Sequence, residues 1–158
     1  MAHWSIPFDK LAKKVGADIE IVVKAAALTV FSDVVIRSPE DTGRFRQNWN
    51  LAYNVMNETI TDETSHGFQG KIDAIRRELL TMPIGGVFWL TNSLPYALVL
   101  EYGLYPNPPK RGTYVKGEGW VIKSIGGYSK QAPHGMVRVA ARNFAEDVAK
   151  AVNGRGRR

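Results

Sequence analysis

The tripeptide Asp41-Thr42-Gly43 matches the motif of the aspartic proteases, in which two aspartates lie about 3 Å apart and share one proton. A single copy per chain suffices for that chemistry when two chains form a dimer. In such enzymes an apolar strand leads into the aspartate, whereas here residues 38–40 (Ser-Pro-Glu) are polar and typical of a helix start. An Arg-Phe-Arg run follows instead of small apolar residues. We therefore expect this tripeptide to shape the backbone and not to cleave peptides.

No other group of residues has the spacing of a catalytic, metal or cofactor site, so we expect no enzyme, no metal and no cofactor. The histidines are far apart and lack ligand spacing such as His-x-x-x-His. The chain has no cysteine, which excludes disulfides and thiolate metal ligands. The glycines of the second half have the wrong spacing for a dinucleotide fingerprint and are typical of turns. These residues are His3, His66, His134, Gly117, Gly119, Gly126 and Gly127.

Length and composition indicate one globular domain over residues 1–158. Of the 158 residues, 44% are apolar and 23% are charged, and the chain is long enough to bury a core without disulfides. We expect a globular part over residues 5–152 and a basic tail over residues 153–158. The N-terminus lacks the features of a signal peptide, and no apolar run is long enough to span a membrane.

The formal net charge of +6 permits a polyanionic partner without requiring one. The C-terminal arginines supply half of it, and they form either a solvated tail or a surface that faces nucleic acid. Aromatic and basic residues also interleave at residues 44–46 and from Tyr105 to Trp120, a composition that binds single strands by stacking and phosphate contact. The alternative is that the aromatic residues fill the core, and it is favoured because Trp49, Trp89 and Trp120 lie within strand patterns.

One long helix is predicted from Ile6 to Arg37, with Ser5 as its cap and Pro7 in its first turn. Apolar residues at spacings of three and four form one stripe along it. Residues 25–31 are apolar nearly all round, so this part must be covered on every side. Either the chain's own elements or a second subunit would cover it. The stripe consists of Phe8, Leu11, Val15, Ile19, Val22 and Ala26.

Residues 38–49 carry the chain from this helix into a strand. Pro39 disfavours helical geometry at Ser38, so the long helix should end there. Ser38 would then cap a new turn with Asp41 three residues later, close to a capping box, and Gly43 would let the backbone bend sharply. We expect the following arginines to bind a neighbouring subunit and the tryptophan to anchor the strand in the core; these are Arg44, Arg46 and Trp49.

The whole pattern predicts an α+β fold, in which a small antiparallel sheet packs against the long N-terminal helix and a C-terminal helix, with long loops. The strand at residues 49–55 alternates apolar residues with an asparagine-rich face that is wet or faces a subunit. The strand at residues 86–92 is apolar on both faces and is therefore expected to be central. Two further helices are predicted to bury an apolar face: residues 71–82, with Ile72, Ile75, Leu79 and Leu80, and residues 135–152, with Val137, Ala140, Ala141, Phe144, Val148 and Ala151. A short helix at residues 96–102 should start at Ser93 and Pro95 and end at Gly103. The remaining predictions are an exposed loop (57–70), two further loops (104–119 and 126–133) and a strand (120–125).

Three blocks of sequence carry a resemblance to a known family. The first runs from residue 38 to 49, the second from 92 to 103, and a weaker third from 132 to 137 precedes the last helix. Together, and in this order and spacing, they resemble the HK97 gp10-like family of tailed-bacteriophage proteins over about residues 5–152. The chain departs from that pattern at the polar segment 57–70 and in the loop after the second block. The matching residues are Ser38, Pro39, Asp41, Thr42, Gly43, Arg44, Trp49, Asn92, Pro95, Tyr96, Glu101, Tyr102 and Gly103.

The resemblance implies a structural virion protein of the phage neck or tail-completion type, assembled in the host cytoplasm. Such proteins form homo-oligomeric rings, commonly sixfold or twelvefold, at the head–tail interface around the DNA channel. Their partners are the head–tail connector and the tail-terminator or tail proteins, with non-specific contact to double-stranded DNA. Arg155, Arg157 and Arg158 are the residues expected to face DNA. The alternative is a basic nucleic-acid-binding module without a role in a virion.

Overall fold

The computed structural model describes residues 8–153, without the side chains of residues 8–12, 14, 15, 147, 148 and 150–153. The described chain has the predicted α+β composition. Its elements are α1 (Phe8–Arg37), α2 (Arg44–Gln47), β1 (Asn50–Tyr53), α3 (Gln69–Thr81), β2 (Phe88–Thr91), α4 (Ala97–Tyr102), β3 (Thr113–Val115), β4 (Gly119–Val121), β5 (Ser124–Ile125), β6 (Tyr128–Ser129) and α5 (Val137–Asn153). The expectations for Ser5, Ile6, Pro7, Phe8, Leu11, Val15, Val148 and Ala151 lie outside the described residues or side chains.

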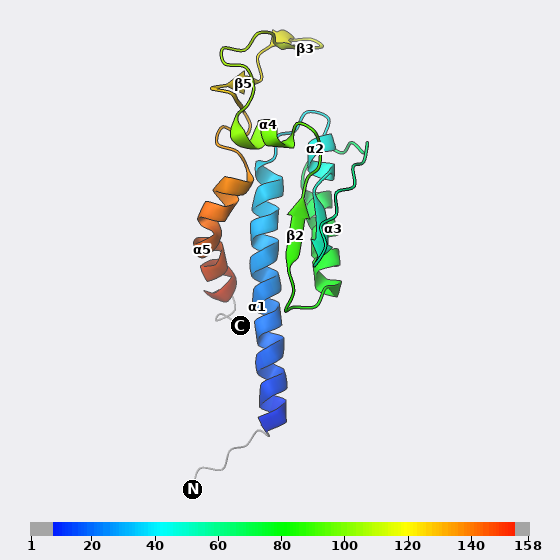
Figure 1. Ribbon diagram of the computed structural model, residues 1–158, viewed down its shortest axis with the longest axis vertical. Helices are drawn as coiled ribbons and strands as arrows, with labels where there is room; N and C mark the ends of the chain where they lie inside the picture. Colours follow the sequence, from blue (N-terminus) through cyan, green and yellow to red (C-terminus); the bar gives the residue numbers. More distant parts are fainter. Residues whose placement is uncertain (1–7, 154–158) are drawn as a thin grey trace.

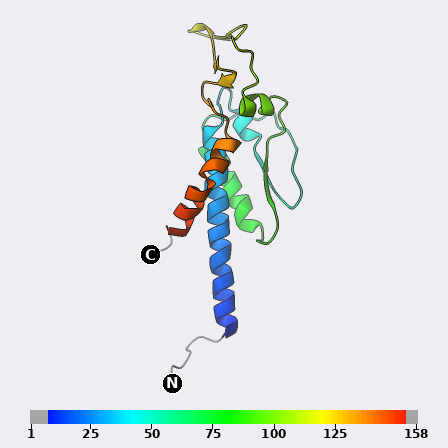
Figure 2. The ribbon, with the colours of Figure 1, turned by 60° about the vertical axis from the view of Figure 1, so that its left-hand side comes forward.

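Helix α1 forms the long axis of the molecule. Helix α5 packs along one side of it, and α3 with strands β1 and β2 lies on the other side (Figure 1). Strands β3 to β6 extend beyond the C-terminal end of α1, and the N-terminal part of α1 extends beyond the ends of α3 and α5 in both views (Figure 2). The result is an elongated molecule with a body around the C-terminal half of α1.

The strands form three separate two-stranded antiparallel ribbons, β1 with β2, β3 with β4, and β5 with β6. The prediction that the second strand is central is therefore wrong, because β2 pairs with β1 alone. Its apolar pattern has another cause, since Phe88 and Leu90 pack against the core that the helices form. The first strand is shorter than predicted. Asn54 adopts a left-handed backbone with φ of 63° and ends the ladder, which leaves Val55 exposed.

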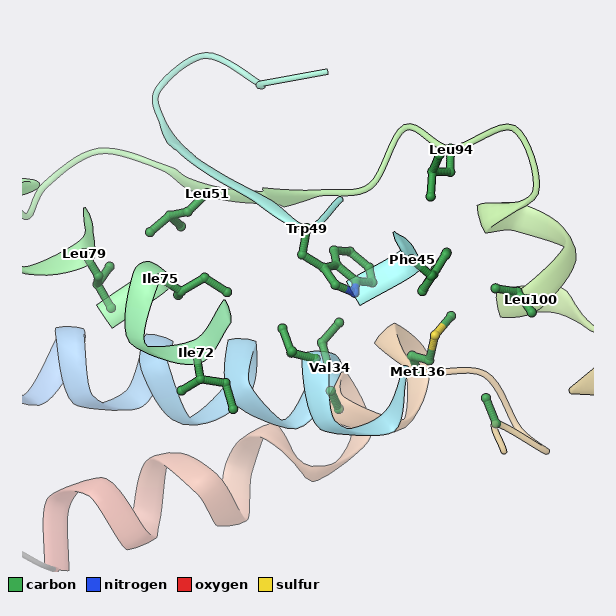
Figure 3. Close-up of a cluster of buried hydrophobic side chains, with 13 residues drawn as sticks. Val34, Phe45, Trp49, Leu51, Ile72, Ile75, Leu79, Leu94, Leu100 and Met136 are labelled. Carbon is green, nitrogen blue, oxygen red and sulfur yellow. The ribbon is translucent and has the colours of Figure 1, made fainter. Parts of the chain in front are cut away.

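The core lies where α1, α2, α3 and α4 meet. In Figure 3 the labelled side chains of these helices and their flanking segments point toward one another, with the indole of Trp49 among them. Trp49 therefore anchors the start of the first strand, as predicted. The buried cluster consists of Val34, Val35, Phe45, Trp49, Leu51, Ile72, Ile75, Leu79, Leu94, Leu100, Ala132, Met136 and Ala140.

The chain's own elements cover α1 only in part. Ala26 is buried and the rest of residues 25–31 are half-buried between α3 and α5, so own-chain packing accounts for much of that stretch. Ile19, which the stripe places on the buried face, is exposed, as are Ile21 and Val23. Helix α3 ends beside this part of α1, where Lys24 Nζ donates to the Leu80 carbonyl at 3.0 Å, so the apolar residues here are covered only in part. Neither α1 nor any other described helix is long and apolar enough to cross a lipid bilayer.

Residues 104–130 contain β3 to β6 and form a projecting unit, which we call the hairpin lobe (Figure 1). The two predicted loops and the single predicted strand are thus two short hairpins, whose turns use glycines at positive φ, as expected of residues 117, 119, 126 and 127. Trp120 is 72% exposed and does not fill the core, contrary to the favoured expectation. Its ring packs against that of Tyr114 across the β3–β4 ribbon, at 5.8 Å between centroids.

Two helices bury only part of their predicted faces. In α3, Ile72, Ile75 and Leu79 are buried, but Leu80 is exposed, because it lies about 100° around the helix from Leu79. In α5, Ala140 is buried, whereas the outer members of the predicted apolar face are left partly open to solvent. Val137, Ala141 and Phe144 are exposed.

The two adjacent leucines of α3 give a matched test of this packing. Leu79 is 2% exposed and Leu80 is 65% exposed. We expect Leu79→Ala to lower the free energy of unfolding by about 2–5 kcal/mol through lost burial and a cavity. Measured on the monomer, the control Leu80→Ala should change it by less than about 0.5 kcal/mol. Urea denaturation measures both, and similar losses in the two variants would contradict the orientation of α3.

Candidate functional site

The three sequence blocks meet in space at the C-terminal end of α1. We call this region the junction, made of residues 38–49, 92–103 and 132–138. The first block follows α1 and contains α2, the second contains α4, and the third leads into α5. The junction is therefore where the body, the hairpin lobe and the last helix are joined, and the contacts between its blocks are described in turn.

Ser38 closes α1 and binds Trp49, the tryptophan of the junction. Its hydroxyl donates to the Val34 carbonyl at 2.8 Å and accepts from Trp49 Nε1 at 2.8 Å. The predicted role of Ser38 as the cap of a new turn is wrong, because its hydroxyl hydrogen-bonds to the last turn of α1 and not to the residues that follow. The buried indole N–H thus finds its partner eleven residues upstream, which fixes the angle between α1 and β1.

Arg46 lies in the interior of the first block and does not reach outward to a neighbour, contrary to expectation. Its Nε donates to the Ser38 carbonyl at 3.0 Å, and its guanidinium forms an ion pair with Glu40. Burial lowers the pKa of the Arg46 guanidinium below its ordinary value. Glu40 in turn accepts from the Gly67 backbone N–H at 3.1 Å, and its other contact is His66 Nδ1 at 2.8 Å. This pair ties α2 to the polar segment 57–70.

Arg44 also binds within its own chain. It forms an ion pair with Asp62 at 2.7 Å and donates to the Thr61 carbonyl at 3.3 Å. Gly43, at φ of 81°, makes the predicted bend, and a Cβ there would lie 1.9 Å from the Ser65 carbonyl oxygen. Because segment 57–70 passes this close, only glycine fits at position 43.

The asparagine face of the first strand is covered at Asn48 and Asn50, where the prediction of a wet or subunit-facing surface is wrong, whereas Asn54 is exposed. Asn48 is fully buried and binds Thr61 twice, through Nδ2 to the carbonyl at 3.0 Å and through Oδ1 from the N–H at 2.8 Å. Asn50 Nδ2 donates to the Thr59 carbonyl at 2.7 Å. These side chains pair with the backbone of segment 57–70 as a neighbouring strand would. The polarity of residues 57–70 concealed this contact.

Asp41 is a surface residue. Its carboxylate accepts from Lys123 of the hairpin lobe at 2.8 Å and is 72% exposed. It caps no helical turn, and Thr42 Oγ1 instead accepts from the Arg44 N–H at 3.4 Å. The expected capping box is therefore wrong. An exposed carboxylate that binds a lysine differs from the aspartates of a dyad, which face each other and share one proton.

The second block binds the first through Asn92 and Tyr96. Asn92 Nδ2 donates to the Phe45 carbonyl at 2.9 Å, and its Oδ1 accepts from the Leu94 N–H at 3.3 Å. Asn92, and not Ser93, thus supports the turn that leads into α4. The ring of Tyr96 packs on Phe45 at 5.9 Å between centroids, while Pro95 is exposed.

Glu101 binds the third block. Its buried carboxylate accepts from three successive backbone N–H groups at the start of α5, those of Met136 at 2.7 Å, Val137 at 3.0 Å and Arg138 at 2.9 Å. A helix leaves its first N–H groups without internal partners, and a negative charge there also complements the helix dipole. Glu101 is therefore the N-terminal cap of α5, supplied from another helix.

Arg138 and Gly103 close the same contact from outside. Arg138 donates to the Glu101 carbonyl at 2.6 Å and to the Tyr128 hydroxyl at 3.0 Å, and its guanidinium lies 4.8 Å from the ring centroid of Tyr102. Gly103 ends α4 with φ of 67°, as predicted, and a Cβ there would lie 2.4 Å from the Tyr128 ring. The Glu-Tyr-Gly run thus joins α4, α5 and the hairpin lobe.

A cleft of about 320 Å³ lies between the junction and the hairpin lobe. Cations and carboxylates both line it, including Glu40, Asp41, Arg44 and Lys123, and these are already paired with one another or with segment 57–70. Burial, followed by the charge of Tyr96, raises the pKa of the Tyr105 phenol on its wall, which keeps that phenol neutral. Within residues 8–153 as described, no group of three or more His, Asp or Glu side chains could hold a metal ion.

The structure thus brings together the motif residues of all three blocks and gives most of them an internal contact. His66 and His134 are exposed, while His3 and the arginines at 155, 157 and 158 lie outside the described residues. A scan of protein-family models and searches of curated proteins and of solved structures give no match to this chain. The junction is therefore interpreted from its own chemistry, which consists of hydrogen bonds and ion pairs that hold elements in place.

Replacing Glu101 tests its role as the cap of α5. Glu101→Gln keeps the shape but removes the charge and one of the two acceptor oxygens, so we expect the free energy of unfolding to fall by about 1–3 kcal/mol. Hydrogen exchange of the amides of residues 136–138 should accelerate more than that of the core helices. The control Glu118→Gln removes the same charge from an exposed turn and should have little effect. Unchanged exchange at residues 136–138 would refute the assignment.

A double-mutant cycle tests the Ser38–Trp49 hydrogen bond. Ser38→Ala leaves the buried Trp49 N–H without a partner and should cost about 1–3 kcal/mol of stability. Trp49→Phe removes the indole N–H, so in that background Ser38→Ala leaves no donor without a partner. The same change should then lower the free energy of unfolding clearly less. Denaturation of the four chains yields the coupling energy, and a value near zero would mean that the contact adds nothing to stability.

Proposed function

We propose that this protein is a ring-forming neck or tail-completion component of a tailed-bacteriophage virion. The observation that carries the proposal is the junction, where the three blocks that resemble the family lie together and bind one another. If the three short matches were due to chance, we would not expect the matching residues to contact one another in the fold. The Asn92–Phe45 and Glu101–Met136 contacts link all three blocks into one unit.

The chemistry of the junction supports a structural role. Ser38, Arg46, Asn48 and Glu101 are buried, and each directs its polar atoms at the backbone or at an oppositely charged side chain of the same chain. A catalytic site needs polar groups that are free to meet a substrate. The junction instead uses its polar groups to fix the relative positions of α1, α4 and α5.

Two exposed apolar surfaces on different flanks support ring formation. A groove of about 440 Å³ lies between α1 and α3. Its lining is mostly apolar and includes Ile21, Leu28 and Leu80, with the charged residues Glu20, Lys24 and Arg76 beside them. Helix α5, on the other side of α1, exposes Val137 and Phe144 (Figure 1). A ring of identical subunits needs two different, mutually complementary surfaces on each copy. We assign the groove of one copy and the exposed face of α5 of the next copy to the ring interface.

The resemblance extends the proposal to the assembly. The ring is expected to be sixfold or twelvefold, to surround the DNA channel at the head–tail interface, and to contact the connector on one side and tail proteins on the other. The elongated shape, with the hairpin lobe at one end and the N-terminal part of α1 at the other, suits a subunit that contacts different layers with its two ends (Figures 1 and 2).

Charged substitutions on the two surfaces test the ring. We expect the wild-type chain to form a closed oligomer by native mass spectrometry and light scattering. Ile21→Glu in the groove and Phe144→Glu on α5 should each give folded monomers, because a buried unpaired carboxylate opposes association. The matched control Val55→Glu, at another exposed apolar position, should leave the oligomer intact.

Mixing the two monomeric variants tests whether the groove of one copy binds α5 of another. In a head-to-tail arrangement each mixture retains one intact interface, so equimolar Ile21→Glu and Phe144→Glu chains should form heterodimers that cannot grow into rings. A wild-type chain that stays monomeric at all concentrations, alone and with the connector of the same virion, would contradict the proposed function.

A further inference from the structure

The positive charge of the chain is concentrated in two short segments. The hairpin lobe, residues 104–130, holds five of the 21 Lys and Arg residues but one of the 15 Asp and Glu residues, a net charge of +4. The tail arginines at 155, 157 and 158 add three more positive charges. The rest of the chain has 13 basic and 14 acidic residues, a net charge of −1. A basic segment on a nearly neutral body is the electrostatic footprint of a polyanion partner.

Most cations of the lobe are exposed and unpaired. Lys110, Arg111, Lys116 and Lys130 are exposed, and the described residues place no carboxylate within ion-pair distance of them. Lys123 is the exception, since it binds Asp41 at 2.8 Å. By contrast, the arginines of the first block are neutralised by partners in their own chain. Four exposed cations without a carboxylate partner among the described residues thus lie on the lobe, where it projects from the body.

The form of the lobe also suits a nucleic acid. It is built from two narrow antiparallel ribbons at one end of the molecule, beyond the C-terminal end of α1 (Figures 1 and 2). Tyr114 and Trp120 pack against each other across the β3–β4 ribbon, and this cross-strand pair stabilises the two-stranded hairpin. A two-stranded ribbon fits the major groove of a DNA duplex.

We propose that the hairpin lobe binds the phosphate backbone of duplex DNA without regard to sequence, through Lys110, Arg111, Lys116 and Lys130. A duplex presents a phosphate about every 1.7 Å along its axis. Cations that are spread over a loop and a hairpin can therefore each contact a phosphate, and no shaped pocket is needed. The choice of duplex DNA as the polyanion rests on the proposed function, whereas the charge distribution does not. The lobe, and not only the arginine tail, is then the surface that faces DNA.

Three charge-matched variants of the full chain test this proposal. Each removes three positive charges: Lys110→Gln, Arg111→Gln and Lys116→Gln in the lobe; Arg155→Gln, Arg157→Gln and Arg158→Gln in the tail; and Lys13→Gln, Arg77→Gln and Arg142→Gln on the body. Binding to a short fluorescein-labelled duplex is measured by anisotropy over a range of salt concentrations. Circular dichroism verifies that each variant is folded.

We expect the lobe variant to bind at least about tenfold more weakly at low salt and to show a shallower salt dependence. The slope of log K against log salt should fall by roughly 2–3, since each lost phosphate contact contributes about 0.9. The body variant should match the wild-type chain. Absence of wild-type binding at low salt, or a loss in the lobe variant no larger than in the body variant, would overturn the proposal and leave an acidic protein surface as the partner of the lobe.

A single-stranded probe of the same sequence distinguishes the source of the phosphates. Tighter binding to the single strand that Trp120→Ala abolishes would overturn the assignment to duplex DNA, because it would require stacking on an aromatic side chain.

Native mass spectrometry of the same samples separates this proposal from the proposed function. Rings without DNA binding refute the lobe assignment alone, and DNA binding by a permanent monomer refutes the ring alone.

Discussion

The placement of α5 depends on the carboxylate of Glu101. The residues just before α5 supply no side-chain cap of their own, and Gly135 adopts a left-handed backbone in which a Cβ would lie 2.5 Å from the Glu101 carbonyl oxygen. The acceptor for the first N–H groups of α5 comes from 35 residues upstream. Helix α5 is therefore completed only when α4 is already in place, and Arg138 then covers the pair from the solvent side. One buried charge thus couples a local element to the tertiary structure, since leaving it unpaired would be costly.

Polar contacts of the same kind determine the geometry of the whole junction. Ser38 sets the start of β1 through the indole of Trp49, and Asn48 holds segment 57–70 as a strand would. Such contacts are directional, whereas apolar packing tolerates several arrangements. Among the described buried side-chain polar atoms, Trp89 Nε1 is the one without a partner. The junction therefore specifies one arrangement of helices, which identical subunits need if they are to form a closed assembly.

The sequence predicted the periodic elements well and the cross-chain contacts poorly. Helices α1, α3, α4 and α5 follow from apolar spacing and from glycine and proline at their ends, because these signals are local. The roles of Arg46 and Asn48 could not be read in this way, since their polarity suggests solvent and their partners come from distant segments. The hairpins of the lobe were missed because strands of two or three residues have no periodicity to detect. Glu101 was singled out only through its place in a family-like motif, and nothing local indicates that it caps a helix.

The lobe begins and ends at almost the same point of the body, since the Tyr105 N–H donates to the Gly127 carbonyl at 3.0 Å and the Lys130 N–H donates to the Lys123 carbonyl at 2.9 Å. The chain leaves the junction and returns to it without passing through the core. Residues can therefore be added to or removed from the β3–β4 ribbon of the lobe without moving Glu101, Ser38 or the helices they hold, and lengthening a closed loop costs little free energy. The body and the lobe are in this sense free to evolve separately: the reach and charge of the lobe can be altered by insertion, deletion or exchange of a segment while the subunit itself keeps its shape.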